Sequence, residues 1–129
     1  MKPKNIKQLA WNAFSKYIRL KNADKNGNVR CITCNKLMHW KESQSGHFVD
    51  GRTNSVLFNE ELVYPQCYRC NVLLHGNKVM FTLFMLKKYS KKQIEQFERL
   101  KNVTLQRKNI EYYDIRDKYK KLVKELEKK

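Results

Sequence analysis

Two Cys-x-x-Cys pairs constrain this chain more than any other feature. They supply its four cysteines, Cys31, Cys34, Cys67 and Cys70, with 32 residues between the pairs. Each pair places two sulfurs at the tip of a tight turn, and Zn²⁺ prefers four such ligands in a tetrahedron. We therefore predict a structural zinc site that encloses a small folded unit. Two disulfides or two redox dithiols are the alternatives, and the absence of a recognisable signal peptide argues against an oxidising compartment.

The charge of the chain indicates an anionic partner. Its 129 residues hold 28 Lys and Arg against 12 Asp and Glu, a formal net charge of +16. The net charge is +7 over residues 1–30, +1 over 31–86 and +8 over 87–129. A nearly neutral centre between basic flanks suits nucleic acid first and an anionic membrane surface second. Some of these lysines simply line solvated helix faces, and no apolar run is long enough to span a membrane.

Apolar periodicity predicts helices at both ends of the chain. Apolar residues recur every three or four positions over 4–21 and from about residue 110 onward, as in an amphipathic helix. Ser90 and Gln93 form a capping-box pattern that begins another helix. For the middle we predict an irregular β-hairpin with strands at 37–40 and 56–58, a short helix over 71–75 and an apolar helix over 78–88.

The last helix carries an apolar seam with alternating steps of three and four residues, formed by Tyr112, Ile115, Tyr119, Leu122 and Leu126. Two heptads of this kind can pack on the core of the same chain or form a coiled coil with a second copy. Packing within the chain is slightly favoured, because two heptads alone give marginal stability. A homodimer through the C-terminal helix remains open.

His47 is the candidate general base. It follows Gly46 at the expected end of a hairpin, where a neutral imidazole can take a proton from water. A lone histidine is more often structural, but Asn59, Asn71 and His75 accompany this one. Asn59 could orient the imidazole by hydrogen bonding, while Asn71 and His75 lie one helical turn apart and could share a hard metal ion. Asp50 and Glu60 are further carboxylates that could contribute.

Basic residues around this centre are candidates for phosphate contacts. Arg52 and Arg69 lie in the nearly neutral middle, where arginine could hold the scissile phosphate with two hydrogen bonds. The remaining candidates are expected to neutralise phosphates over a long footprint without reading sequence. They are Arg19, Lys21, Lys78, Lys87, Lys88, Lys91 and Lys92.

The order of these motifs resembles the NinG (Rap) family of phage recombination proteins. The shared order is Cys-x-x-Cys, Gly-His, Phe-Asn, Cys-x-x-Cys-Asn and Gly-Asn, and the likeness covers roughly residues 10–125. The segment 14–20 and the tail with Tyr112, Ile115 and Tyr119 are similar too. The resemblance implies a structure-specific DNA endonuclease acting on branched recombination intermediates such as Holliday junctions and D-loops. It also implies kinship with HNH, or ββα-metal, nucleases.

Carried over position by position, the resemblance implies that His47 is the general base and that Asn59 orients the hairpin or the base. Asn71 stands where many relatives have a metal-binding histidine. This is a departure, so either Asn71 binds the catalytic Mg²⁺ or Mn²⁺ through its carbonyl oxygen or His75 takes over. His47 is a further candidate ligand of that ion. Ser45 and Gly46 stand where some relatives keep a second ligand before the general base.

We therefore expect an α+β fold: a zinc-braced HNH-like ββα-metal core, made of a small β-hairpin plus a helix, between N- and C-terminal helices. The expected division is a basic helical arm (1–28), the core (29–88) and basic C-terminal helices (89–129). The expected function is endonucleolytic cleavage of branched DNA in the cytoplasm of a bacterial host cell, without a membrane partner. A non-catalytic zinc protein that binds DNA or RNA is the main alternative, and a protein that binds an acidic partner is a third.

Overall fold

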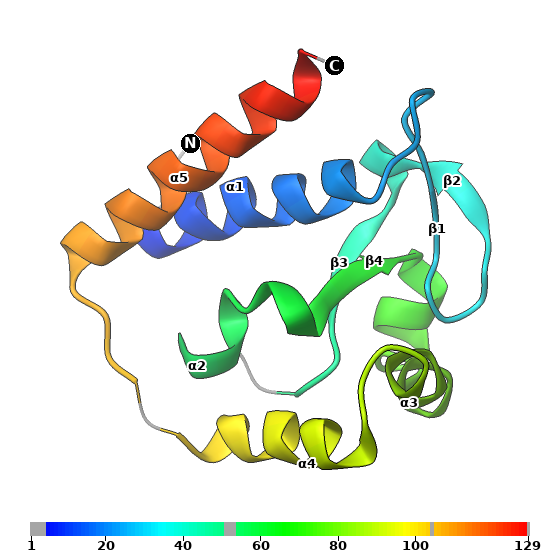
Figure 1. Cartoon of the computed structure of the whole chain (residues 1–129). Helices are drawn as coiled ribbons and strands as arrows, with labels where there is room; N and C mark the ends of the chain where they lie inside the picture. The colour runs from blue at the N-terminus through cyan, green and yellow to red at the C-terminus, as the bar shows by residue number, and fades with distance from the viewer. Residues whose placement is uncertain (1–4, 51–53, 104, 129) are drawn as a thin grey trace.

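Helices at the two ends of the chain pack side by side in the computed structural model, which describes residues 5–50, 54–103 and 105–128, without the side chains of 54 and 55. They are α1 (Ile6–Lys21) and α5 (Asn109–Glu127) (Figure 1). Phe14, Ile18 and Tyr119 are buried between them. The two predicted basic arms are therefore in contact, because each helix has one apolar face that must leave water.

The apolar seam of α5 faces its own chain. Tyr112 and Tyr119 are buried, and the Tyr119 ring packs edge-on against Phe14 with centroids 5.0 Å apart. Ile115 and Leu122 pack against the same cluster. Of the two alternatives, packing on the chain's own core is the one observed, and a homodimer through this seam stays a prediction.

The middle of the chain forms two small antiparallel sheets rather than one hairpin. Strand β1 (Asn28–Arg30) pairs with β2 (Leu37–His39), and β3 (Gln44–His47) pairs with β4 (Val63–Gln66). Short 3₁₀ turns follow β2 at η1 (Trp40–Glu42) and precede β4 at η2 (Glu60–Leu62). The fold class is thus α+β, as predicted.

The prediction of a strand at 56–58 is wrong, because residues 56 and 57 belong to the helix α2 (Asn54–Leu57). Val56 and Leu57 are both buried, although neighbouring residues of a strand point to opposite faces. An apolar run of three residues is too short to show whether its period is that of a strand or a helix.

Helices close the far side of the core. After β4 the chain makes a single wide turn, η3 (Arg69–Leu73), and continues into α3 (Lys78–Leu86), α4 (Lys91–Arg99) and a short turn, η4 (Leu100–Asn102). The capping box is confirmed: the Gln93 N–H donates to Ser90 Oγ at 3.2 Å, and the Ser90 N–H donates to Gln93 Oε1 at 3.0 Å.

Phe81, Met85 and Ile94 pack with Phe48 and Tyr64 in the second core cluster. No described helix is both long and apolar enough to cross a bilayer.

Candidate metal centre and active site

The four cysteines converge on one point. Their sulfur atoms all lie within 4.8 Å of one another, and Cys34 Sγ is 3.7 Å from Cys67 Sγ. Four thiolates around Zn²⁺ at about 2.3 Å would be separated by about 3.8 Å, so the cluster matches a tetrahedral zinc site. The sulfurs are too far apart for disulfide bonds, and all four cysteines are free.

Local backbone turns bring each sulfur pair together. Asn35 adopts a left-handed conformation (φ 67°), and the Cys31 N–H donates to the Lys36 carbonyl at 2.9 Å, which closes the first knuckle. The Ile32 N–H donates to the Pro65 carbonyl at 3.1 Å and joins this knuckle to β4. Cys67 and Cys70 follow at the end of β4. A zinc ion here would therefore connect the two sheets.

The environment of Cys31 favours the thiolate form that binds metal. Burial opposes ionisation of its thiol, but hydrogen bonds from the Thr33 hydroxyl and from the backbone N–H groups of Cys67, Cys34 and Thr33 outweigh it and lower the pKa to about 6. Burial and the neighbouring sulfurs raise the pKa of Cys34 to about 12. Four thiols this close cannot all ionise without a cation, and a zinc ion would supply the missing charge.

A second constellation lies beside the cysteines. His47, Asn71 and His75 line one hollow of about 280 Å³, together with Asp50 and Lys78. His47 comes from the end of β3, whereas Asn71 and His75 come from the turn after β4. Three of the predicted site residues therefore face one cavity. The cavity also brings in Asp50, one of the two carboxylates expected to be available.

Contacts with two described residues hold the His47 ring. Its Nε2 lies 3.3 Å from the Leu57 carbonyl oxygen, and its face stacks on the Trp11 indole with centroids 5.0 Å apart. A carbonyl only accepts hydrogen bonds, so this contact assigns the proton of the neutral ring to Nε2 and the lone pair to Nδ1. Nδ1 is then the atom that can accept a proton.

Asn71 and His75 offer further ligand atoms to the hollow. The Asn71 Nδ2 donates to Gln44 Oε1 at 2.7 Å, which identifies Oδ1 as the oxygen that could bind a cation. His75 is exposed and sits in the left-handed region (φ 50°), followed by Gly76 at φ 93°. Left-handed backbone at a non-glycine residue is uncommon and occurs often at functional sites.

Lys78 braces the wall of this hollow. Its ammonium donates to the carbonyl oxygens of His47 at 2.6 Å and Phe48 at 2.8 Å, and it lies 3.1 Å from Asp50 Oδ1. These three acceptors match the three donors of an ammonium group. Lys78 was predicted as a phosphate contact, but its geometry is that of a residue holding the His47 segment in place.

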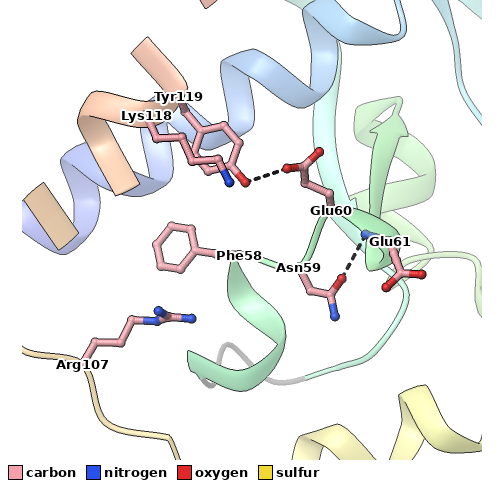
Figure 2. Close-up of a pocket in the computed structure, with 7 residues that line it drawn as sticks. All are labelled: Phe58, Asn59, Glu60, Glu61, Arg107, Lys118 and Tyr119. Atoms are coloured by element: carbon pink, nitrogen blue, oxygen red, sulfur yellow. Dashed lines mark hydrogen bonds between the residues drawn. The ribbon is translucent and has the colours of Figure 1, made fainter. Parts of the chain in front are cut away.

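Asn59 lies in a different hollow, of about 410 Å³, shown in Figure 2. Its Oδ1 accepts a hydrogen bond from the Glu61 N–H at 3.0 Å and so caps η2. The predicted contact of Asn59 with the imidazole is therefore not formed, and the Leu57 carbonyl takes that place. A role of Asn59 in catalysis stays a prediction.

Glu60 shares the hollow of Asn59 and is tied into the fold. It accepts a hydrogen bond from the Tyr119 hydroxyl at 2.8 Å and lies 3.5 Å from Lys21 Nζ. Burial, and then the hydrogen bond to Glu60, raise the pKa of Tyr119. Glu60 thus connects α5 to η2 rather than contributing to the His47 hollow.

The predicted phosphate contacts fall into two groups. Arg69, Lys87, Lys91 and Lys92 are exposed on η3 and around the α3–α4 junction. The others have protein partners. Arg19 donates to the carbonyls of Ser15 and Ser43 and lies over the Trp40 ring. Lys21 pairs with Glu60, and Lys88 lies 3.3 Å from the Tyr64 hydroxyl. Arg52 lies outside the described residues.

Sequence reasoning missed Trp11 and Leu57 as the groups that hold His47. Trp11 lies within the helix predicted over 4–21, where nothing distinguishes it from the other apolar residues, and a main-chain carbonyl leaves no signal in the sequence.

Comparison with known proteins gives one family. The family model described as "Bacteriophage Lambda NinG protein" matches residues 1–129. No curated protein and no solved structure matches the chain.

Proposed function

Because this chain belongs to the NinG family, and so to a group of bacteriophage proteins related to recombination, we propose that it is a metal-dependent endodeoxyribonuclease. Its proposed substrates are branched recombination intermediates such as Holliday junctions and D-loops. The observation that carries the proposal is the hollow in which an oriented imidazole, His47, meets Asn71, His75 and Asp50 beside the cysteine cluster.

The order of elements supports a relationship to ββα-metal nucleases. Strands β3 and β4 pair with His47 opposite Val63, and the turn after β4 returns Asn71 to β3 through its bond to Gln44. Two antiparallel strands and a helical turn thus frame the hollow. In such a site the strand positions the base, and the turn supplies cation ligands.

The chemistry starts at Nδ1 of His47. This atom accepts a proton from a water molecule, whose oxygen then attacks the scissile phosphorus while the bond to the leaving sugar oxygen breaks. The Leu57 carbonyl stabilises the imidazolium through the Nε2 proton, and stacking on Trp11 keeps the ring in one plane. The leaving oxygen takes up a proton, and the products are a phosphate monoester and a free hydroxyl.

The hollow holds donors that suit a hard cation. The carboxylate of Asp50, Oδ1 of Asn71 and the imidazole of His75 form a mixed oxygen and nitrogen set compatible with Mg²⁺ or Mn²⁺. When bound, such an ion supplies charge stabilisation for the phosphate in the transition state. Zinc would have a separate, structural role at the four cysteines.

DNA binding would rest on the exposed cations for which the described part of the chain shows no protein partner. Lys87, Lys91 and Lys92 lie close together in the chain at the α3–α4 junction. Contacts of this type give affinity without sequence preference and weaken with salt. Such a surface suits recognition of a branch by its shape.

A nicking assay tests the proposal. The zinc-loaded chain is incubated with end-labelled four-way-junction DNA, with and without Mg²⁺. We expect Mg²⁺-dependent nicks from the wild type, and none from His47→Ala despite unchanged zinc content and DNA affinity. His39→Ala is the matched control, because His39 lies outside the hollow and accepts a hydrogen bond from the Lys41 N–H.

Two outcomes would contradict the proposal. Undiminished nicking by His47→Ala would remove this residue from the mechanism. Tight DNA binding by the wild type without cleavage under any divalent cation would favour the alternative, a non-catalytic zinc protein that binds nucleic acid.

A further inference from the structure

Helix α3 carries apolar side chains on both of its sides. Phe81 and Met85 are fully buried in the core, whereas Val79 is 75% exposed, Leu83 50% and Leu86 48%. Residues at positions i, i+4 and i+7 share one side of a helix. Val79, Leu83 and Leu86 therefore form a continuous outward row, called here the α3 stripe. A helix that is apolar all round is normally covered on all sides.

The apolar surface extends beyond the stripe. Met80 is 45% exposed on α3, and Leu73 and Leu74 on the preceding turn are 59% and 39% exposed. Only three residues join Leu74 to the helix. Single exposed apolar residues are ordinary, but a contiguous patch on the order of several hundred Å² marks an interaction site.

The stripe is uncharged although the chain carries a net charge of +16. The polar side chains of α3 are Lys78 and Thr82. Lys78 is bound to the carbonyls of His47 and Phe48, and the Thr82 hydroxyl donates to the Lys78 carbonyl at 2.8 Å. A DNA backbone would gain nothing from this surface, because it offers no cation. Two copies of a strongly basic chain, in contrast, can approach closely only over such an uncharged face.

We propose that the α3 stripe is a dimer interface that pairs with the same stripe of a second copy. A two-fold interface uses one patch on both subunits, which a row of Val, Leu and Leu satisfies by itself. Standard interfaces bury about 800 Å² per partner around an apolar, charge-poor centre. The stripe with Met80 and Leu73 supplies that centre. In antiparallel pairing, Lys87 of one copy and Lys87 of the other lie at opposite ends of the interface.

The seam of α5 does not compete for this role within the described structure. Its Tyr119 is buried against Phe14 of α1, and its Tyr112 is buried beside Phe58. The α3 stripe also begins one residue after Lys78, which contacts the His47 segment. If the proposed nuclease function holds, pairing through α3 brings two hydrolytic centres to one branched substrate; this consequence rests on that proposal, and the interface itself does not.

Sedimentation equilibrium of the zinc-loaded chain over the micromolar range tests the interface. We expect the wild type to dimerise and Leu83→Lys to raise the dissociation constant at least about tenfold, because each copy loses a buried leucine and gains a facing cation. Ile110→Lys is the matched control: Ile110 is 63% exposed on α5, away from the stripe. It should dimerise like the wild type.

A mixing experiment guards against a general loss of structure. Leu83→Lys and Leu83→Glu should each be monomeric and should pair with one another when mixed, with circular dichroism and zinc content unchanged. A monomeric wild type, or an undisturbed dimer in Leu83→Lys, would overturn the proposal. So would a monomer that needs Leu83 to bind vesicles of mixed neutral and anionic phospholipid. These readouts need no DNA cleavage, so a failed nicking assay leaves them intact.

Discussion

The Trp11 indole lies flat against the His47 imidazole, with 21° between the two planes. The two residues come from α1 and from the end of β3. The N-terminal helix therefore reaches the proposed general base directly, although none of its described residues lines the hollow.

Replacing Trp11 should impair catalysis more than binding. Stacked aromatic pairs contribute about 0.5–1.5 kcal/mol, so Trp11→Leu should lower kcat for nicking roughly two- to tenfold. Trp11→Phe keeps an aromatic face and should retain most of the rate. Single-turnover nicking and a separate binding assay check this. A fall in DNA affinity at unchanged kcat would show that Trp11 contacts DNA instead.

Loss of one zinc ligand should unfold the middle of the chain. Cys67→Ser removes a buried sulfur from the cluster, and structural zinc sites contribute directly to folding. We expect stoichiometric zinc to be lost and residues 29–74 to become sensitive to protease. Chelator treatment of the wild type should reproduce this, and added Zn²⁺ should reverse it only in the wild type. Full protease resistance in Cys67→Ser would rule out a structural zinc.

Gly46 should not tolerate a side chain. A Cβ at this position would lie 1.8 Å from Gln66 Oε1, and Gln66 is fully buried with its Nε2 bonded to Thr33 Oγ1 and the Gly76 carbonyl. Gly46→Ala should therefore lower the free energy of unfolding by about 1–3 kcal/mol. Urea denaturation measures this change.

The cause can be separated by a double-mutant cycle. Gln66→Ala removes the clashing atoms, so adding Gly46→Ala to it should cost much less than in the wild type. Equal costs in both backgrounds would place the effect in the backbone of β3 and not in the contact with Gln66.

Lys78 should behave as a structural lysine. Lys78→Met loses three acceptors at once and should lower stability by about 1–2 kcal/mol after allowance for its partial exposure. The salt dependence of DNA binding should stay unchanged. Lys87→Met is the comparison, and it should reduce the slope of log affinity against log salt by about one. A reduced slope in Lys78→Met would return Lys78 to the phosphate contacts.

Tyr119 should make the fold sensitive to alkali. Its pKa is raised by burial and by Glu60, so its neutral form stabilises the native state fully below the unfolded pKa of about 10. Above that pH the unfolded chain binds fewer protons than the native one, and stability falls as pH rises. The urea midpoint should therefore drop more steeply above about pH 10 in the wild type than in Tyr119→Phe. Tyr113→Phe, at an exposed tyrosine, should follow the wild type; parallel curves for all three would contradict the prediction.

The family and the cysteine cluster were predictable because both depend on residue type and spacing. The NinG resemblance is confirmed by the family match, and the four sulfurs meet as predicted. The helices at 4–21 and from about 110 were also predicted, because long amphipathic periods are strong signals. The prediction of a strand at 56–58 was wrong because three apolar residues are too few to show a periodicity.

The candidate site was predictable only in part. His47, Asn71 and His75 share a hollow, as the sequence predicted, although His47 lies between the two cysteine pairs and the other two residues follow the second pair. Asn59 lies elsewhere because its carbonyl group caps η2. The position of this cap depends on how α2 and η2 pack, which the sequence does not show.

By itself the sequence determined what is local: two cysteine pairs at fixed spacing, helices with one apolar face, a capping box and an excess of positive charge. The tertiary structure decided which distant groups meet, such as Trp11 with His47 and Tyr119 with Glu60. It also decided that Lys78 points inward while Val79 and Leu83 face solvent. The physical reason is that contacts between remote residues depend on how whole elements pack, and no short-range pattern records that packing.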